Sequence, residues 1–417
     1  MNPLATVKRT LPAIRGSNAG LLWLAAACSI GLTGFLLARA ALSMRMSFAG
    51  GTAVDYLALA SAGRLVHAGN QCLYCVPDLA QAQSQLLGYM PRLSDSFPVS
   101  FVNPPIVAWL IQPLALLSLQ AGTNAFVTLN IAAMALAAAM LIRYVQPATG
   151  RLLAVGLVTA LVFSLAADTG ILLGQSDGLL LLSGTAAIVA LDRGRPTLAG
   201  FLLVPLMLKP QLMWLVPIVL IIARQWRMLL GPAIGAVIIA ATSVLLIGPA
   251  HLGDVVAVLT SHGYQHLDLQ SNSIPSLVAR PAGSNGAAWV VAFVVAAVAC
   301  VTTFAFRKRL HANPVSALAL GLALSVCLSP HLGDYSLMLL AVPAVVLART
   351  GSRNAESLPL VLALTVAFTV ATIINPLAQW GISVVAAILL FGLLAVLVQS
   401  SSFRVWRRGP TPEAIAA

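Results

Sequence analysis

The chain has 417 residues, of which 59% are hydrophobic and only 8% are charged, and its formal net charge is +12. A soluble domain carries about 25% charged residues, so this composition excludes a water-soluble globular protein. The basic residues stand in short clusters at the ends of apolar segments rather than along one face, which argues against nucleic-acid binding.

Apolar segments long enough to cross a bilayer recur along the chain. A spanning helix needs about 20 residues, or ~30 Å, and backbone within hydrocarbon must satisfy its own hydrogen bonds, which favours helices. We therefore predict an all-α, polytopic transmembrane protein of about twelve spans (roughly 11–13), with residues 1–417 forming a single membrane domain. The predicted spans are 20–42, 102–119, 124–142, 151–167, 171–191, 197–223, 229–248, 288–306, 314–328, 335–348, 357–374 and 378–398.

The N-terminal residues 1–19 contain Lys8, Arg9 and Arg15 and are expected in the cytoplasm by the positive-inside rule. The first apolar run is longer than the 7–15 residues of a signal peptide, which favours an uncleaved helix. Residues 43–101 are then a large first outer loop. Within it, the mostly apolar stretch 56–67 suits a helix lying in the membrane interface.

Two features of this loop carry chemistry. Asp55 stands at the start of the interfacial helix, where it is either a helix cap favoured by the helix dipole or a functional carboxylate. Cys72 and Cys75 form a C-x-x-C pair. Conditions outside the cytoplasm permit a disulfide, and a second cysteine pair that would complete a zinc site is absent. A structural pair or free thiols are favoured over a redox function.

Two topologies remain open between residues 102 and 223. If every segment crosses once, Arg193 and Arg195 lie outside. If 197–223 breaks at Lys209-Pro210 into two short helices, these arginines return to the cytoplasm and one segment before residue 168 is re-entrant or incomplete. The proline and the cost of a lysine at full depth favour the break. Lys209 itself either binds a phosphate or snorkels to the headgroups.

Basic clusters alternate cleanly after Arg224, so 249–287 is predicted to be a second outer loop and 399–417 a cytoplasmic tail. Both termini are then cytoplasmic, in a cell membrane. In the second loop, His262, His266 and Asp268 either permit a metal site or belong to a solvated loop. Further on, His331 is a candidate proton shuttle or phosphate donor.

The motifs of soluble nucleotide-binding and hydrolase enzymes are absent, but four stretches form a pattern in a fixed order. They are Asp55-Tyr56 with Gly69 and Tyr74; Phe101 to Pro105 with Gln112-Pro113-Leu114; Gly174 to Leu179 with Arg193 to Pro196, Ala199-Gly200, Lys209-Pro210-Gln211 and Arg224 to Arg227; and Asn272-Ser273-Ile274 with Ser329 to Tyr335. Together these stretches resemble glycosyltransferase family 87, membrane enzymes of the C superfamily that use polyprenyl-phosphate sugars. The sequence departs from the family pattern at Val102-Asn103, where relatives often carry an aromatic residue, and at Ser336, where an acidic residue is common.

The resemblance implies a GT-C-like fold and an inverting transferase. Such an enzyme moves a sugar, mannose in the best-known members, from a polyprenyl-phosphate donor to a lipid or glycan acceptor at the outer face. It also implies that Asp55 is the catalytic base. The candidates for binding the donor phosphate and substrate are Lys209, His331, Arg64, Gln175, Asn103 and Tyr335.

A D-x-D pattern is absent, so we expect a reaction that needs no metal or other cofactor. The main alternative is a multi-spanning transporter or lipid flippase, although such proteins tend to show repeated halves and polar residues near the midplane. A non-enzymatic membrane subunit that positions a partner is a second alternative.

Overall fold

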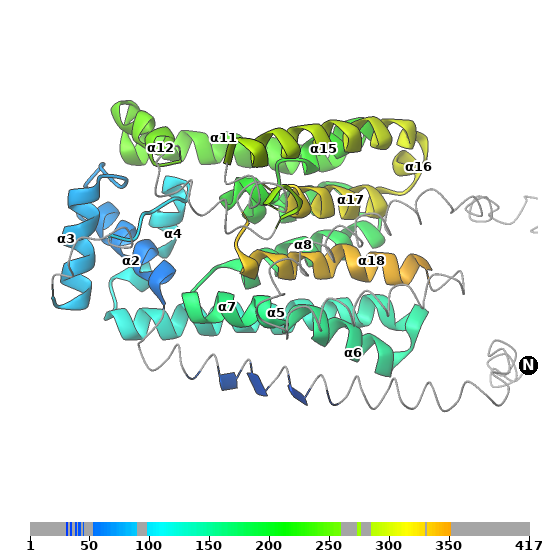
Figure 1. The fold of residues 1–417 in the computed structure, drawn as a ribbon, viewed down its shortest axis with the longest axis horizontal. Coiled ribbons are helices and arrows are strands. Elements are labelled where there is room, and N and C mark those ends of the chain that lie inside the picture. Colours follow the sequence, from blue (N-terminus) through cyan, green and yellow to red (C-terminus); the bar gives the residue numbers. More distant parts are fainter. Residues whose placement is uncertain are drawn as a thin grey trace, which may run out of the picture.

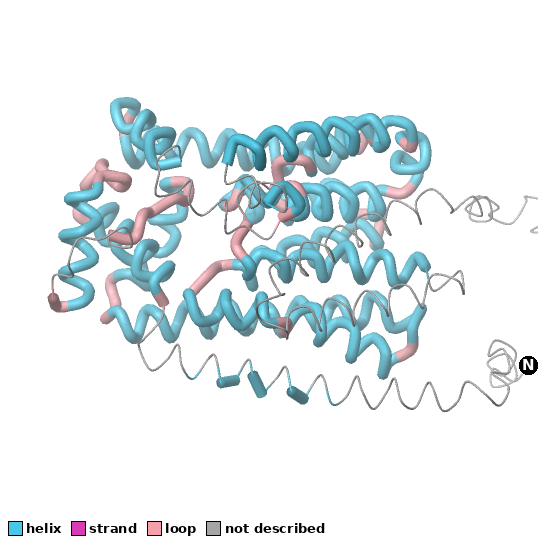
Figure 2. Tube along the Cα trace, viewed as in Figure 1, coloured by secondary structure: helices cyan, strands magenta, loops and turns pink. Residues whose placement is uncertain are grey.

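The computed structural model describes residues 53–89, 98–259, 273–276, 285–329 and 332–351, and eight positions between 31 and 45. Figure 1 shows the course of the chain, and Figure 2 shows helices and loops but no strand in the described part, which confirms the all-α prediction there. The helices are α2 (Val54–His67), α3 (Val76–Leu87), α4 (Pro105–Ala115), α5 (Leu119–Thr149), α6 (Arg151–Val162), α7 (Leu165–Leu173), α8 (Asp177–Asp192), α9 (Pro196–Leu202), η3 (Val204–Leu208), η4 (Pro210–Leu212), α10 (Val216–Ile222), α11 (Trp226–Ile247), η5 (Pro249–His251), α12 (Leu252–Leu259), α15 (Asn285–Ala305), α16 (Arg307–Ala312), α17 (Pro314–Cys327), η6 (Asp334–Leu340) and α18 (Ala341–Gly351).

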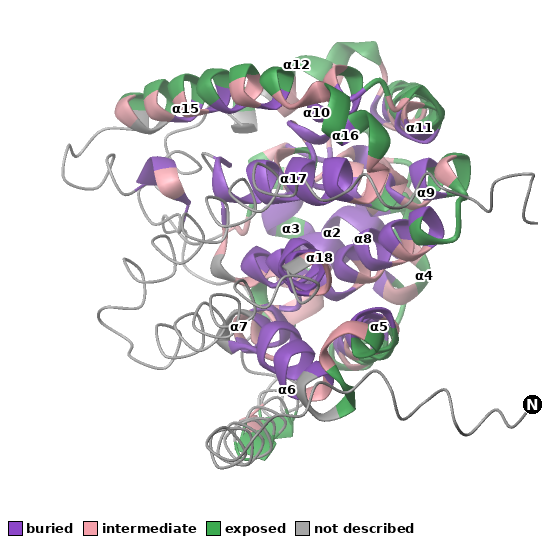
Figure 3. Ribbon diagram, turned by 90° about the vertical axis from the view of Figure 1, so that its right-hand side faces the viewer, coloured by how far each residue is buried: buried purple, intermediate pink, exposed green. Residues whose placement is uncertain are grey.

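Two described helices, α5 and α11, are long and apolar enough to cross a membrane, and α6 with α7 makes a third if the bent pair is one span. The other apolar helices that the structure describes are shorter. Large apolar side chains such as Val237, Leu245 and Val301 are exposed on α11 and α15, and Figure 3 shows these outer helices largely exposed. Outward-facing apolar surface of this kind suits lipid rather than water. The count of twelve spans stays a prediction, and the segments 357–374 and 378–398 lie outside the described residues.

The predicted span 102–119 is wrong. Only α4 forms there, and its 11 residues measure about 16 Å, too short to cross ~30 Å of hydrocarbon. α4 packs instead against α2, where the Arg64 side chain donates to the carbonyls of Ala115 and Leu117 at the end of α4. A helix of this length is consistent with the incomplete segment that the broken topology predicts.

The predicted helix at 56–67 is confirmed as α2, but the protein covers it on nearly every side. Residues 56–63 are all buried, because α3 and α4 pack against this helix. Its composition agrees with that position, since a helix that is apolar all round belongs in an interior. The position of α2 relative to a membrane interface stays a prediction.

The break at Lys209-Pro210 is confirmed, and it turns the chain back on itself. The segment divides into α9, η3, η4 and α10, with Lys209 between the two 3-10 turns. Lys209 pairs with Asp177 at the start of α8, whereas Asp192 at the other end of α8 pairs with Arg349. The helix α8 has 16 residues and is about 24 Å long. The segment that follows it therefore begins near the C-terminal end of α8 and reverses direction near the N-terminal end.

Residues 196–222 finish near the C-terminal end of α8, where they begin. Gln225, just after α10, donates to the carbonyls of Leu310 and His311 in α16, and α16 lies with the C-terminal end of α18 at the right of Figure 1. Residues 196–222 therefore form a re-entrant hairpin. The helix ends and short loops that meet at this end, which we call the basic end, carry ten of the described arginine and lysine residues: Arg143, Arg151, Arg193, Arg195, Arg224, Arg227, Arg307, Lys308, Arg309 and Arg349.

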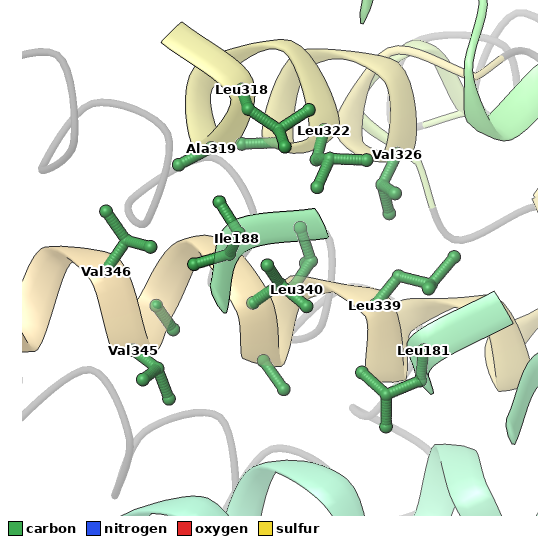
Figure 4. Close-up of a cluster of buried hydrophobic side chains, with 14 of the residues drawn as sticks. Leu181, Ile188, Leu318, Ala319, Leu322, Val326, Leu339, Leu340, Val345 and Val346 are labelled. Atoms are coloured by element: carbon green, nitrogen blue, oxygen red, sulfur yellow. The ribbon is translucent and has the colours of Figure 1, made fainter. Parts of the chain in front are cut away.

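The interior is built around α8, which is buried on almost every face. In Figure 4 its Leu181 and Ile188 lie among apolar side chains of α17, η6 and α18, including Leu322 and Val345. This packing fixes the first residue of α8, Asp177, inside the protein at the end opposite the basic residues.

A close approach of α9 and α11 depends on two glycines. A Cβ added at Gly231 would overlap the backbone of Gly200 and Phe201, and one added at Gly200 would overlap the backbone of Met228. Small residues at helix crossings allow this contact between backbones in membrane proteins.

We predict that Gly231→Ala lowers the stability of the protein by about 1–3 kcal/mol, the usual cost of overpacking. The control is Gly253→Ala in α12, where a Cβ meets no atom within 4 Å and alanine is the better helix former. Thermal unfolding of the two variants in detergent measures the difference. Equal midpoints would show that the crossing tolerates a methyl group.

Candidate functional site

A buried ion pair anchors the site. Lys209 Nζ lies 2.6 Å from Asp177 Oδ2, and the lysine is 8% exposed and the aspartate 1%. Either charge alone in this position would cost several kcal/mol in lost hydration. The ion pair therefore holds the turn of the re-entrant hairpin against the start of α8.

Gln175 connects this pair to Asp55. Lys209 Nζ donates to Gln175 Oε1 over 2.6 Å, and Gln175 Nε2 donates to Asp55 Oδ2 over 2.5 Å. Because an ammonium group can only donate, it fixes the amide with its oxygen toward Lys209 and its NH₂ toward the carboxylate. The orientation of the amide therefore follows from the lysine.

A glycine makes this contact sterically feasible. Gly174 has a φ of +71°, and a Cβ there would lie 2.8 Å from the Cβ of Tyr56. Both the left-handed backbone and the close approach exclude a larger residue. The turn at Gly174 thus brings Gln175 against the first turn of α2, beside Asp55.

The segment η6 closes the other side of the ion pair. Ser336 Oγ donates to Asp177 Oδ1 over 2.7 Å, and Lys209 Nζ lies 4.7 Å from the centre of the Tyr335 ring, within the range of a cation–π interaction. A serine at 336 suits this contact, because an ionised acid there would repel the Asp177 carboxylate.

Asp55 does not cap α2. The N-cap residue is Ala53, no side chain caps the helix, and Asp55 lies within the first turn. The cap interpretation is therefore wrong, although the helix dipole still favours an anion at this position. Burial raises the pKa of Asp55, an effect that the Gln175 hydrogen bond and the Lys209 charge partly oppose. A carboxylate with a raised pKa is a stronger base than an ordinary aspartate.

A small cavity adjoins the cluster. Its volume is about 10 Å³, space for about one water molecule. It is lined in part by Asn130, Gln175, Asp177 and Met338. Because a sugar ring is far larger, a substrate must approach the half-buried Asp55 from outside this cavity or separate the surrounding segments.

The structure brings Asp55, Gln175, Lys209 and Tyr335 together, but two other candidates lie elsewhere. Arg64 is nine residues further along α2, where it bonds to the end of α4. The backbone carbonyl of Asn103 accepts a hydrogen bond from the Tyr74 hydroxyl. His331, and the possible metal ligands His262, His266 and Asp268, lie outside the described residues.

Asp177 and Ser336 belong to the cluster, and the candidate set from the sequence lacks both. A signal for Asp177 exists, since a lysine between two apolar runs needs an anionic partner and only Asp168, Asp177 and Asp192 lie between residues 102 and 223. Asp168 pairs instead with Arg39 over 2.8 Å. We find no comparable signal for Ser336, because its contact depends on how η6 packs against α8.

One family model matches the chain. The model described as Glycosyltransferase family 87 matches residues 101–330, more than half of the 417 residues. The match includes Gln175, Asp177 and Lys209, whereas Asp55 and Tyr335 lie outside it. No curated protein and no solved structure matches the chain.

We predict that Lys209→Met destabilises the protein by about 3–5 kcal/mol, because it leaves the Asp177 carboxylate buried without its counter-charge. The double variant Lys209→Met with Asp177→Asn removes both charges and should recover a large part of this loss. Thermal unfolding of both variants in detergent checks the difference. The ion-pair interpretation fails if the double variant is as unstable as the single one.

Proposed function

Because the chain belongs to glycosyltransferase family 87 and is therefore a membrane glycosyltransferase, we propose that it transfers a sugar from a polyprenyl-phosphate donor to a lipid or glycan acceptor. Mannose is the proposed sugar. Asp55 is the general base, and the transfer inverts the anomeric configuration. Family membership favours this enzyme over the transporter, flippase and accessory-subunit alternatives.

In the proposed reaction an acceptor hydroxyl attacks the anomeric carbon of the donor. Asp55 takes the hydroxyl proton as the new C–O bond forms, and the bond from the anomeric carbon to the phosphate oxygen breaks. The electron pair of that bond leaves with the polyprenyl phosphate. Attack on the face opposite the leaving group inverts the configuration. Oδ2 of Asp55 accepts from Gln175, so Oδ1 is the oxygen we assign to the acceptor hydroxyl.

The leaving phosphate gains negative charge and needs a fixed cation or donor nearby. Lys209 is separated from Asp55 by the single side chain of Gln175. We propose that Lys209 supplies positive potential to the leaving phosphate, while Asp177 and Tyr335 hold its ammonium group in place. Because Asp177 balances the lysine charge, this contribution is smaller than that of an unpaired cation.

The outer face is the proposed location of the reaction. The basic end carries ten of the described arginine and lysine residues, and the positive-inside rule assigns such an end to the cytoplasm. Asp177 and Lys209 lie at the opposite end of α8, about 24 Å away. This arrangement supports an active site that faces away from the cytoplasm, where a lipid-linked donor is required in place of a nucleotide sugar.

The observation that carries the proposal is the hydrogen-bonded chain from Asp177 through Lys209 and Gln175 to Asp55. The test incubates purified protein with a panel of radiolabelled polyprenyl-phosphate sugars and a bacterial lipid extract. We expect transfer from one donor and a product of inverted anomeric configuration. Retention of configuration, or transfer only from a nucleotide sugar, would refute the mechanism.

We predict that Asp55→Asn lowers kcat by about 10²–10⁴-fold, the usual contribution of a general base, while the protein stays folded. Asp78→Asn is the matched control, because Asp78 lies in the first turn of α3 and accepts a hydrogen bond from Asn70 that an asparagine oxygen can also accept. The two variants are compared by their rates of sugar transfer and by thermal unfolding in detergent. Comparable activity in both variants would remove Asp55 from the mechanism.

The activity should also depend on pH in a definite direction. The base form of Asp55 is ionised, so kcat/KM rises with pH through a pKa that burial has raised above the ordinary aspartate value. Gln175→Leu removes a hydrogen bond that lowers this pKa and should move the acidic limb of the profile to higher pH. The control Gln112→Leu, whose side chain contacts His67, should leave the limb in place. A limb that moves to lower pH contradicts the assignment.

A further inference from the structure

A second cluster of polar side chains lies at the other end of α2. Cys72 and Cys75 come from the turn between α2 and α3, while His251 ends η5 and Asp254 lies in α12. One donor atom from each of the four lies within 4.8 Å of the others. His251 Nδ1 is 2.8 Å from Asp254 Oδ2 and 3.7 Å from Cys72 Sγ. Thus the tertiary structure supplies the two further ligands that the C-x-x-C sequence lacks.

We propose that the dithiol form of this cluster binds one Zn²⁺ ion through the two cysteine sulfurs, the histidine nitrogen and an aspartate oxygen. Zinc takes such donors in tetrahedral geometry, with bonds of about 2.3 Å to sulfur and 2.0–2.2 Å to nitrogen and oxygen. Donor atoms around the ion are then roughly 3.3–3.8 Å apart. The observed spread of up to 4.8 Å therefore needs a small contraction, and the two sulfurs, joined as a disulfide in the structure, must separate to this spacing once they are reduced. Four protein ligands make a closed, structural site.

The backbone around the cysteines already has a defined shape. The Cys72 N–H donates to Asn70 Oδ1 over 2.7 Å, and the Asn70 amide donates in turn to Asp78. The Cys75 N–H donates to the Cys72 carbonyl, and Cys75 is the N-cap residue of α3. The positive end of the α3 dipole favours negative charge on the Cys75 sulfur. The turn thus presents both sulfurs to the same side.

An apolar cluster holds the two halves of the site together without the metal. Ile247 at the end of α11 is fully buried among residues that include Leu65, Leu73 and Tyr74. Ile247 precedes His251 by four residues, and Leu73 and Tyr74 lie between the two cysteines. Because these flanking residues pack against each other, the cost of bringing the ligands together is largely met before zinc binds.

The structure joins Cys72 and Cys75 as a disulfide, with their Cα atoms 5.3 Å apart. The pair therefore has two states. A thiol reductant supplies two electrons and two protons to convert the disulfide to the dithiol, and zinc then displaces the two thiol protons as its bonds to sulfur form. Asp55 lies in the first turn of α2, at the opposite end of the helix from His67 and about 18 Å from it along the helix axis, so the zinc site is separate from the proposed catalytic base.

The experiment titrates Zn²⁺ into the full-length protein, purified in detergent and reduced with a phosphine that does not chelate metal. We expect one zinc per chain by elemental analysis, and Co²⁺ in its place should show thiolate charge-transfer bands and the intense d–d bands of tetrahedral cobalt. Zinc should also raise the thermal unfolding temperature, because it binds the folded state. Cys72→Ser with Cys75→Ser should abolish all three signals, and His251→Ala should weaken binding by at least tenfold.

Control variants keep the outcome unambiguous. Cys300→Ser and Cys327→Ser replace the two described cysteines outside the cluster, and His67→Ala replaces an exposed histidine that is not one of the proposed ligands; none should alter zinc binding. The proposal is overturned if the reduced wild-type protein binds no more zinc than the double serine variant, or if the cobalt spectrum lacks thiolate bands. These readouts are independent of sugar transfer, so a failure here leaves the proposed function intact.

Discussion

The buried pair of Lys209 and Asp177 is the contact on which the arrangement of the site depends. A lysine in an apolar interior loses its hydration, and only a nearby anion with good geometry restores much of that energy. Asp177 can serve because α8 is packed on nearly every face and its first residue is therefore buried. The lysine in turn stands at the break in the re-entrant hairpin, where the chain must reverse. The contact between Lys209 and Asp177 therefore joins the buried end of α8 to the turn of the hairpin.

The side-chain amide of Gln175 connects the ion pair to the Asp55 carboxylate. Since the ammonium group holds the oxygen of Gln175, the NH₂ group is left to bind Asp55. The aspartate is thereby fixed in direction and kept close to a positive charge, while burial keeps its proton affinity high. A fixed orientation and a raised pKa both suit a carboxylate to the proposed role of general base. The family match covers the ion pair and the amide but not Asp55, so the structure is what joins the aspartate to them.

The opposite end of α2 is organised by different chemistry. There α2 is tied to α4 by Arg64 and to the end of α11 by the apolar cluster around Ile247. The cysteine, histidine and aspartate side chains add a polar link between the same two regions of the chain. The helix α2 carries Asp55 at one end and adjoins this link at the other. A bond or metal ion that joins these four side chains would therefore also restrict the movement of the helix that carries the proposed base.

The sequence by itself determined the class of protein, the helical secondary structure of the described part, the helix at α2 and the break at Lys209. These follow from local properties: the length of apolar runs, the missing N–H of proline and the rarity of charge. The sequence also predicted a crossing at 102–119, where apolar composition alone hides the fact that an 11-residue helix packs on α2. Only the tertiary structure paired Asp177 with Lys209, added Ser336 to the site and removed Arg64 from it. It also brought His251, 179 residues away, to Cys72. Such contacts depend on how distant segments pack, and no local pattern of residues records that packing.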